Sequence, residues 1–220
     1  MQRSWRTDVD KLTFIACLPL SSTSSSPPRS IQTPHQLTPG IADSPSSMIG
    51  DVNLFLTPSS SSPSPPSSPS QNHNGTPILT LITGEIELMI APLPHRRKGH
   101  GRGAILAFLT YISTHLPSIL SEYARGQEPP LKEGDVRLEG LRVKIGVGNV
   151  GSLALFRSLG FVGKEGKEGK EEPNYFGEVE LWFKGELGED GNGDVVRELR
   201  ERWGVEGYEE LVYGGEEADI

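Results

Sequence analysis

The feature that most constrains the fold of this chain is residues 84–104, GEIELMIAPLPHRRKGHGRGA, where a strand pattern runs through a basic, glycine-rich turn into a helix pattern. Apolar and more polar residues alternate over residues 85–90, so one face of a strand is apolar. Behind the turn, apolar residues recur at helical spacing until Pro117 predicts the end of the helix. They are Ile105, Phe108, Leu109, Ile112 and Leu116. This order of elements is typical of a mixed α/β domain.

The turn has the chemistry of an anion site. Glycine lets the backbone approach an anion closely, the first N–H groups of a helix have no internal acceptor, and the helix dipole favours negative charge at that end. Arginines and a lysine add full positive charge. The turn therefore predicts a phosphate cradle, with a solvated basic loop as the alternative. Its residues are Arg96, Arg97, Lys98, Gly99, His100, Gly101, Arg102 and Gly103.

The spacing within the turn excludes two common phosphate motifs. No Gly-Lys-Ser/Thr follows, as a P-loop requires, and Gly99, Gly101 and Gly103 are spaced two by two rather than as G-x-G-x-x-G. His95 and His100 do not share a helical face, and no carboxylate or cysteine stands near them in sequence. No metal site is therefore expected.

A second unit, NVGSLALFRSLGF, predicts a short amphipathic helix. Asn149 is a preferred N-cap residue, and Gly160 stands where a glycine commonly ends a helix. The apolar residues between them share one face. They are Leu153, Phe156 and Leu159. Phe161 then starts another strand.

Further strands are predicted where apolar, aromatic and β-branched residues alternate. These stretches are residues 12–20, 48–56, 141–147 and 176–183, and a short helix is expected near residues 195–203. With the two units above, they predict a mixed α/β fold.

Four segments are expected to be flexible insertions. Residues 21–47 and 57–76 are dominated by Ser and Pro, a composition that cannot bury enough apolar surface to offset the entropy of ordering. Residues 117–140 are rich in Pro, Glu and Gly, and residues 163–174 in Gly, Lys and Glu.

The chain is expected to form one domain over residues 1–184, followed by an acidic tail over residues 185–220. Its formal net charge of -8 over 220 residues argues against a nucleic-acid partner. No apolar run is expected to reach the roughly 20 residues of a membrane span. The single cysteine, Cys17, excludes an internal disulfide framework and has apolar neighbours that favour burial. A cytoplasmic location is expected, with the nucleus as the alternative.

The turn and residues 149–161 together resemble the GCN5-related N-acetyltransferase superfamily, and the matching segments lie in the family order. More narrowly, SWRTDVDKLTFI, MIGDVNLFL, GEIELMIAP and FGEVELWF are similar to the N-acetyltransferase 9-like branch. The resemblance implies a mixed, mainly antiparallel central sheet flanked by helices. It also implies acetyl-CoA as cosubstrate, with its pyrophosphate on the turn amides, and a protein or peptide amine as acceptor.

The resemblance assigns the rest of the cofactor site. It implies that the strand backbone of Met89, Ile90 and Ala91 pairs with the pantetheine arm. The far end of that arm would be flanked by Asn149, Ser152 and Phe156.

Three departures from the family pattern bear on catalysis. Family members begin with a strand and two helices that shape the acceptor site, whereas this chain starts near the end of the second helix; a late start in the gene model is expected, with a true truncated form as the alternative. The glutamate that often follows the glycine turn is replaced by Gly103. The tyrosine that serves many members as general acid is Phe156, whose ring cannot donate a proton.

Two carboxylates on the polar face of the strand are the catalytic candidates. Glu85 or Glu87 could take the proton of the attacking amine, with ordinary solvent-facing glutamates as the alternative. An amide near Ile90 could hold the thioester carbonyl if the strand splays, and a thiol with a pKa of about 8.5 leaves without an acid. An acetyl-CoA-dependent N-acetyltransferase is therefore predicted. A CoA-binding or non-catalytic interaction protein on a degenerate fold is the alternative.

Overall fold

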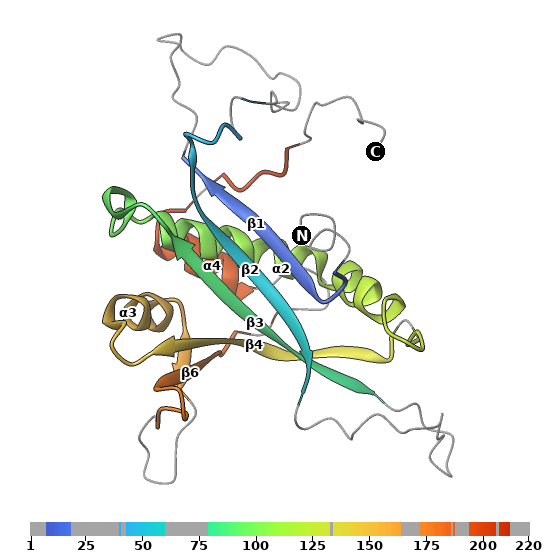
Figure 1. Cartoon of the computed structure of the whole chain (residues 1–220). Helices are drawn as coiled ribbons and strands as arrows, with labels where there is room; N and C mark the ends of the chain where they lie inside the picture. Colours follow the sequence, from blue (N-terminus) through green and yellow to red (C-terminus); the bar gives the residue numbers. More distant parts are fainter. Residues whose placement is uncertain are drawn as a thin grey trace.

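A computed structural model describes residues 8–18, 40, 43–59, 79–132, 134–163, 172–185, 187, 194–205 and 207–211. Figure 1 shows the strands and helices that these residues form. In chain order they are β1 (Lys11–Cys17), β2 (Met48–Pro58), β3 (Thr80–Ile90), η1 (Leu93–His95), α2 (His100–Arg125), β4 (Val136–Gly146), α3 (Val150–Ser158), β5 (Phe161–Gly163), β6 (Glu178–Phe183) and α4 (Asp194–Arg202).

The strands form one sheet in the order β1-β2-β3-β4-β6-β5. β3 and β4 are parallel, and the other neighbouring pairs are antiparallel. α2 makes the crossover that a parallel pair of strands requires. The predicted mixed α/β fold with a mainly antiparallel central sheet is therefore confirmed.

α2 runs along one face of the sheet and supplies the centre of the core (Figure 1). Ile105, Leu109 and Ile112 are fully buried, in one cluster with strand residues such as Leu54 and Ile86. Their spacing is the helical stripe that the sequence predicted. The side chains of alternate strand residues, which point to the other face of the sheet, include several charged groups.

The expected end of this helix at Pro117 was wrong, and so was the flexible insertion over residues 117–140. α2 continues through Pro117 to Arg125, and β4 already begins at Val136. A proline inside a helix costs roughly 3 kcal/mol, since it removes one hydrogen bond and crowds the preceding turn. The turns beyond it bury Ile119 and Tyr123 in the core, and this burial offsets that cost.

α2 is long and apolar enough to cross a membrane by length and composition alone. The expectation that no run reaches this length was wrong, because the helix does not stop at Pro117. Nearly half of its most apolar window, 44%, is buried inside the fold. Its apolar stripe packs on the sheet, which makes α2 the core helix of this domain.

The short helix expected near residues 195–203 is confirmed as α4, but it is not part of a separate tail. Val196 and Leu199 are buried in the same core as α2. Figure 1 shows α4 beside α2, behind the sheet. The domain therefore extends well beyond residue 184.

Most of the expected insertions at 21–47, 57–76 and 163–174 lie outside the described residues. The second one begins later than predicted, because β2 continues through Pro58. Ser59 behind it is buried, and its hydroxyl donates a hydrogen bond to Glu139. Cys17, expected to be buried, is only partly buried at the end of β1.

Candidate functional site

A cleft opens where β3 and β4 separate. The parallel pairing of the two strands stops at Glu85 and Arg142. β3 continues to Ile90 paired only with β2, while β4 continues to Gly146 paired only with β6. The carboxyl halves of the two strands therefore diverge, and this splay allows an amide of β3 to face a substrate.

The strand β3 directs backbone groups into this gap. Ala91 donates its N–H to the carbonyl oxygen of Ile49 on β2, at 2.9 Å. Along an antiparallel strand, the backbone N–H groups of successive residues point alternately toward a given neighbour and away from it. The N–H groups of Leu88 and Ile90 therefore point away from β2. They face the side on which β4 has left the sheet, and an extended ligand can pair with them there.

Arg96 fixes the turn to the end of β3. Its Nε donates to the carbonyl oxygen of Ile90 at 2.8 Å, and its Nη2 donates to that of Ala91 at 2.9 Å. The sequence analysis assigned Arg96 to the cofactor. In the structure two nitrogens of its guanidinium donate to backbone carbonyls, and these bonds hold the turn against the end of β3.

The turn then passes into α2 through Gly99, which is the N-cap and has a left-handed φ of 88°. No side chain caps the helix, and the first backbone bond runs from the N–H of Gly103 to the carbonyl of Gly99 at 3.0 Å. The N–H groups of His100, Gly101 and Arg102 consequently have no acceptor within the helix. Together they form the predicted anion cradle.

Gly101 brings this cradle close to the strand. A Cβ atom at Gly101 would lie 3.2 Å from Leu88 Cδ2 and 3.5 Å from Leu155 Cδ2. The first turn of α2 is therefore packed between β3 and α3, and glycine permits that approach. Next to it, the non-glycine residue Arg97 has a φ of 59°.

The end of β3, the turn and the start of α3 enclose a cleft of about 790 Å³. The predicted cofactor residues that line it are Met89, Ile90, Arg96, Arg97, Gly99, Gly101, Arg102, Asn149 and Ser152. Lining residues that the sequence analysis missed are Leu88, His95, Gly148, Val150, Gly151, Ala154 and Leu155. Most of these missed residues belong to the first turns of α3. They lie beside the end of β3 only because β4 leads the chain there, which local sequence patterns do not reveal.

The other predicted cofactor residues do not line the cleft; they are Ala91, directly after β3, and Lys98, His100 and Gly103 of the turn. Phe156 was also assigned to the cofactor, and the structure places it elsewhere. Its ring is buried in the core, 5.1 Å from the ring of Phe161. It shares the apolar face of α3 with Leu153, so it points away from the wall that the cleft uses.

Asn149 starts α3 as predicted. Its side-chain oxygen accepts a hydrogen bond from the N–H of Ser152 at 3.2 Å. The cap uses one of the free amides of this helix. Asn149 and Ser152 therefore shape the wall of the cleft beside the splay.

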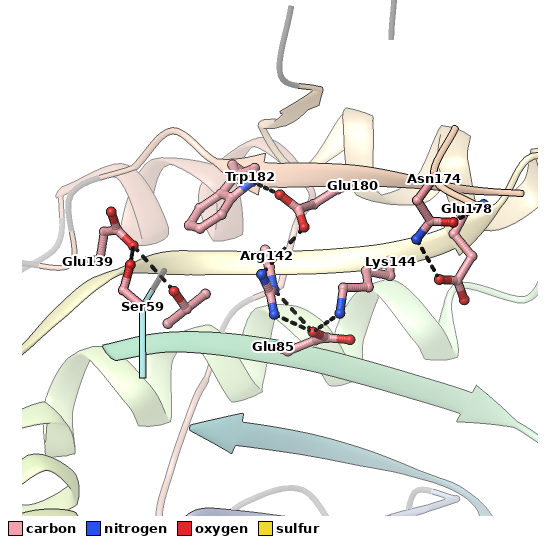
Figure 2. Close-up of polar contacts among 10 residues, drawn as sticks. Ser59, Glu85, Glu139, Arg142, Lys144, Asn174, Glu178, Glu180 and Trp182 are labelled. Carbon is pink, nitrogen blue, oxygen red and sulfur yellow. Dashed lines mark hydrogen bonds and ion pairs between the residues drawn. The ribbon is translucent and has the colours of Figure 1, made fainter. Parts of the chain in front are cut away.

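Glu85 lies in a network of charged side chains on the polar face of the sheet (Figure 2). Its Oε2 lies 3.0 Å from Arg142 Nη2 and 2.9 Å from Lys144 Nζ. Arg142 Nη1 also lies 3.4 Å from Glu180, which accepts a hydrogen bond from the indole of Trp182 at 2.6 Å. These contacts join β3, β4 and β6 at the root of the splay.

Glu87 lies two residues after Glu85 on β3, closer to the cleft, and is exposed. It shares the polar face of β3 with Glu85 and with Met89, which lines the cleft. Neither glutamate lines the cleft itself. Among the residues that the structure describes, no group of His, Cys, Asp and Glu is arranged to hold a metal ion.

A mainly antiparallel sheet that splays beside a glycine-rich helix start, with a second helix walling the gap, defines a GCN5-related N-acetyltransferase domain. No family model matches the chain. An N-acetyltransferase 9-like protein of Schizosaccharomyces pombe is 36% identical over an alignment of 174 positions that covers 73% of this chain and 67% of that protein. The chain belongs to the N-acetyltransferase 9-like family, as the resemblance indicated.

Two more relatives are named alpha/beta-tubulin-N-acetyltransferase 9. The Drosophila melanogaster protein is 34% identical over 74% of this chain and 56% of its own length. The human protein is 35% identical over 60% of this chain and 49% of its own length. The chain thus spans half to two thirds of these relatives. Among solved structures, Arabidopsis thaliana NAA60 in complex with acetyl-CoA covers 79% of this chain and 73% of its own, at 12% identity and a TM-score of 0.37.

Proposed function

We propose that this chain binds acetyl-CoA in the cleft and transfers the acetyl group to a protein amine. The observation that carries the proposal is the joining of two features in one cavity of about 790 Å³. The unpaired amides of the α2 start suit a pyrophosphate, and the unpaired edge of β3 suits an amide-bearing chain. Pantetheine carries amides and is attached to a pyrophosphate in CoA.

The turn fits this cosubstrate in space and charge. A Cβ at Gly99 or Gly103 would meet no atom within 4 Å, so the glycines leave the anion side of the turn open. Arg97 and Lys98 are exposed there, and Arg97 lines the cleft. Both add positive charge beside the free amides.

Backbone and side-chain groups of this chain would then assist the transfer of the acetyl group. The amine nitrogen forms a bond to the acetyl carbon, and the bond from that carbon to sulfur breaks. The N–H of Ile90 would donate to the carbonyl oxygen as it gains charge. The thiolate leaves without an acid, since Phe156 is buried and cannot supply a proton.

Glu87 is the base that we propose for the proton lost by the amine, directly or through a water. It is exposed on β3, whereas Oε2 of Glu85 is engaged by two cations. A general base must reach a proton-bearing substrate, and an exposed carboxylate beside the cleft meets that condition.

The names of the relatives support a protein amine as the acceptor. Because two of them are named for acetylation of alpha/beta-tubulin, tubulin is the first acceptor to test. The test incubates the full chain with acetyl-CoA and tubulin dimer and measures thiol release together with the acetyl mass added to tubulin. Release that depends on both reactants supports the proposal, with Gly101→Asp as the inactive variant.

The second candidate is a CoA-binding interaction protein without catalysis. Two observations favour it, the burial of Phe156 and the absence of a carboxylate among the described residues that line the cleft. If the folded chain binds CoA but thiol release stays at the uncatalysed rate with tubulin and with amine peptides, this second candidate replaces the first.

A further inference from the structure

A cation–π contact joins the C-terminal part of the domain to the anion turn. The guanidinium carbon of Arg102, in the first turn of α2, lies 3.6 Å from the ring centroid of Trp203. Arg102 lines the cleft. Trp203 follows directly after α4, in the segment that the sequence suggested was an acidic tail.

The fold of this segment explains why Trp203 lies there. Val196, Leu199 and Trp203 fall at i, i+3 and i+7, so they extend one apolar stripe along α4. Gly204, with a φ of 61°, ends the helix in the left-handed conformation, and the N–H of Val205 bonds to the carbonyl of Arg200 at 2.9 Å. Val196 and Leu199 are buried, and with the cap they hold the indole, itself 36% exposed, over the start of α2.

This stacking determines what Arg102 can do. A guanidinium on an aromatic face is held by a cation–π contact and keeps its edges free for planar recognition of phosphate. The Nε of Arg102 is buried and has no hydrogen-bond partner among the described residues. The contact therefore holds a cationic side chain with unused donor capacity next to the free amides of the turn.

We propose that Trp203 is a positioning residue that holds Arg102 to bind a phosphate of the CoA cosubstrate. The inference rests on the proposed function, since it assigns a further ligand within the same cleft. It also makes residues 194–205 part of the cosubstrate site rather than a solvated tail.

The test is a double-mutant cycle of CoA affinity in the full chain, with Arg102→Ala, Trp203→Ala and the double variant. Each single change is expected to weaken binding about tenfold, the size of one charge-assisted contact. The double variant should bind as weakly as Arg102→Ala alone, because Trp203 acts through Arg102. Trp203→Phe keeps an aromatic face and should retain most of the affinity. Arg137→Ala, which removes an exposed arginine on β4, is the matched charge control.

Dephospho-CoA separates the two phosphate groups that could be involved. If Arg102 binds the 3′-phosphate, both single variants lose affinity for CoA only. If it binds the pyrophosphate, they lose affinity for both ligands by the same factor. Either pattern supports the proposal, whereas unchanged affinity for both ligands, or losses that add in the double variant, overturns it. If the wild-type chain binds neither ligand, the proposed function itself has failed.

Discussion

The Nε of Arg96 donates a hydrogen bond to the carbonyl oxygen of Ile90 at 2.8 Å, which ties the first basic residue of the turn to the last residue of β3. This carbonyl faces the splay and has no strand partner there. The same side chain also reaches the carbonyl of Ala91. Arg96 therefore fixes the position of the anion cradle relative to β3. From the sequence, its charge was expected to bind phosphate.

Removing Arg96 should disturb the cradle without removing a phosphate ligand. Arg96→Ala is expected to lower the free energy of unfolding by about 1 kcal/mol, the scale of exposed hydrogen bonds, and to weaken CoA binding. Urea unfolding and calorimetry measure the two effects. Arg137→Ala is the control, and a loss of affinity with unchanged stability would show instead that Arg96 binds the ligand directly.

Arg97 should show opposite effects on stability and binding. Its φ of 59° lies in the left-handed region, where a side chain is strained and glycine is not. Arg97→Gly is therefore expected to raise the free energy of unfolding by up to about 1 kcal/mol while it lowers CoA affinity, because a cation is lost. Arg97→Asn, which tolerates this φ, should behave similarly. A destabilised Arg97→Gly variant would contradict this account.

The two glutamates of β3 should separate structure from catalysis. Glu85→Gln removes the charge between Arg142 and Lys144, and we expect a loss of about 1 to 3 kcal/mol of stability. Glu87→Gln should leave stability unchanged and lower kcat about a hundredfold or more, if it is the base. Chemical denaturation and a pH–rate profile of thiol release distinguish them. A Glu87→Gln enzyme with wild-type kcat and pH profile would remove Glu87 from the mechanism.

The C-terminal segment should become less stable in acid. Hydrogen bonds from Tyr208 and then from His115 lower the pKa of Glu210 below its ordinary 4.5. The folded state therefore gains stability from the charged carboxylate above pH 4.5, and loses it as pH falls through the lower folded pKa.

The matched variant for this prediction is Glu210→Gln. Its free energy of unfolding should fall short of the wild-type value near neutral pH, and the gap should close as the pH drops below the folded pKa of Glu210. Urea titrations between about pH 3 and pH 7 test this window. A gap of constant size across the series would show that the charge of Glu210 contributes nothing.

The local signals in the sequence predicted the strand, the glycine turn and α2 because periodicity and helix-start chemistry are properties of neighbouring residues. The end of α2 was missed because the burial of Ile119 and Tyr123 outweighs the local effect of Pro117. The first residues of β4 were missed for a similar reason, since Val136 pairs with Thr80, which lies far away in sequence.

The sequence likewise predicted some residues of the candidate site and missed the roles of others. Gly99 and Gly101 were identifiable from spacing, because their role is a backbone property of the turn. The role of Arg96 was not, because its hydrogen bonds to Ile90 and Ala91 depend on how the turn folds back. Trp203 could not be placed beside Arg102 from sequence, since only the packing of α4 on α2 brings them together.

The central claim is that the cleft binds acetyl-CoA through the start of α2, and calorimetric titration tests it most directly. A side chain at Gly101 would crowd Leu88 and Leu155, and an aspartate there also places a negative charge beside the amides. The control is Ser118→Asp, which adds the same negative charge at an exposed position of α2 far from its start. We predict saturable binding by the wild type and by Ser118→Asp, and none by Gly101→Asp. A folded wild-type chain that does not bind, or a Gly101→Asp variant that binds equally well, would contradict the account.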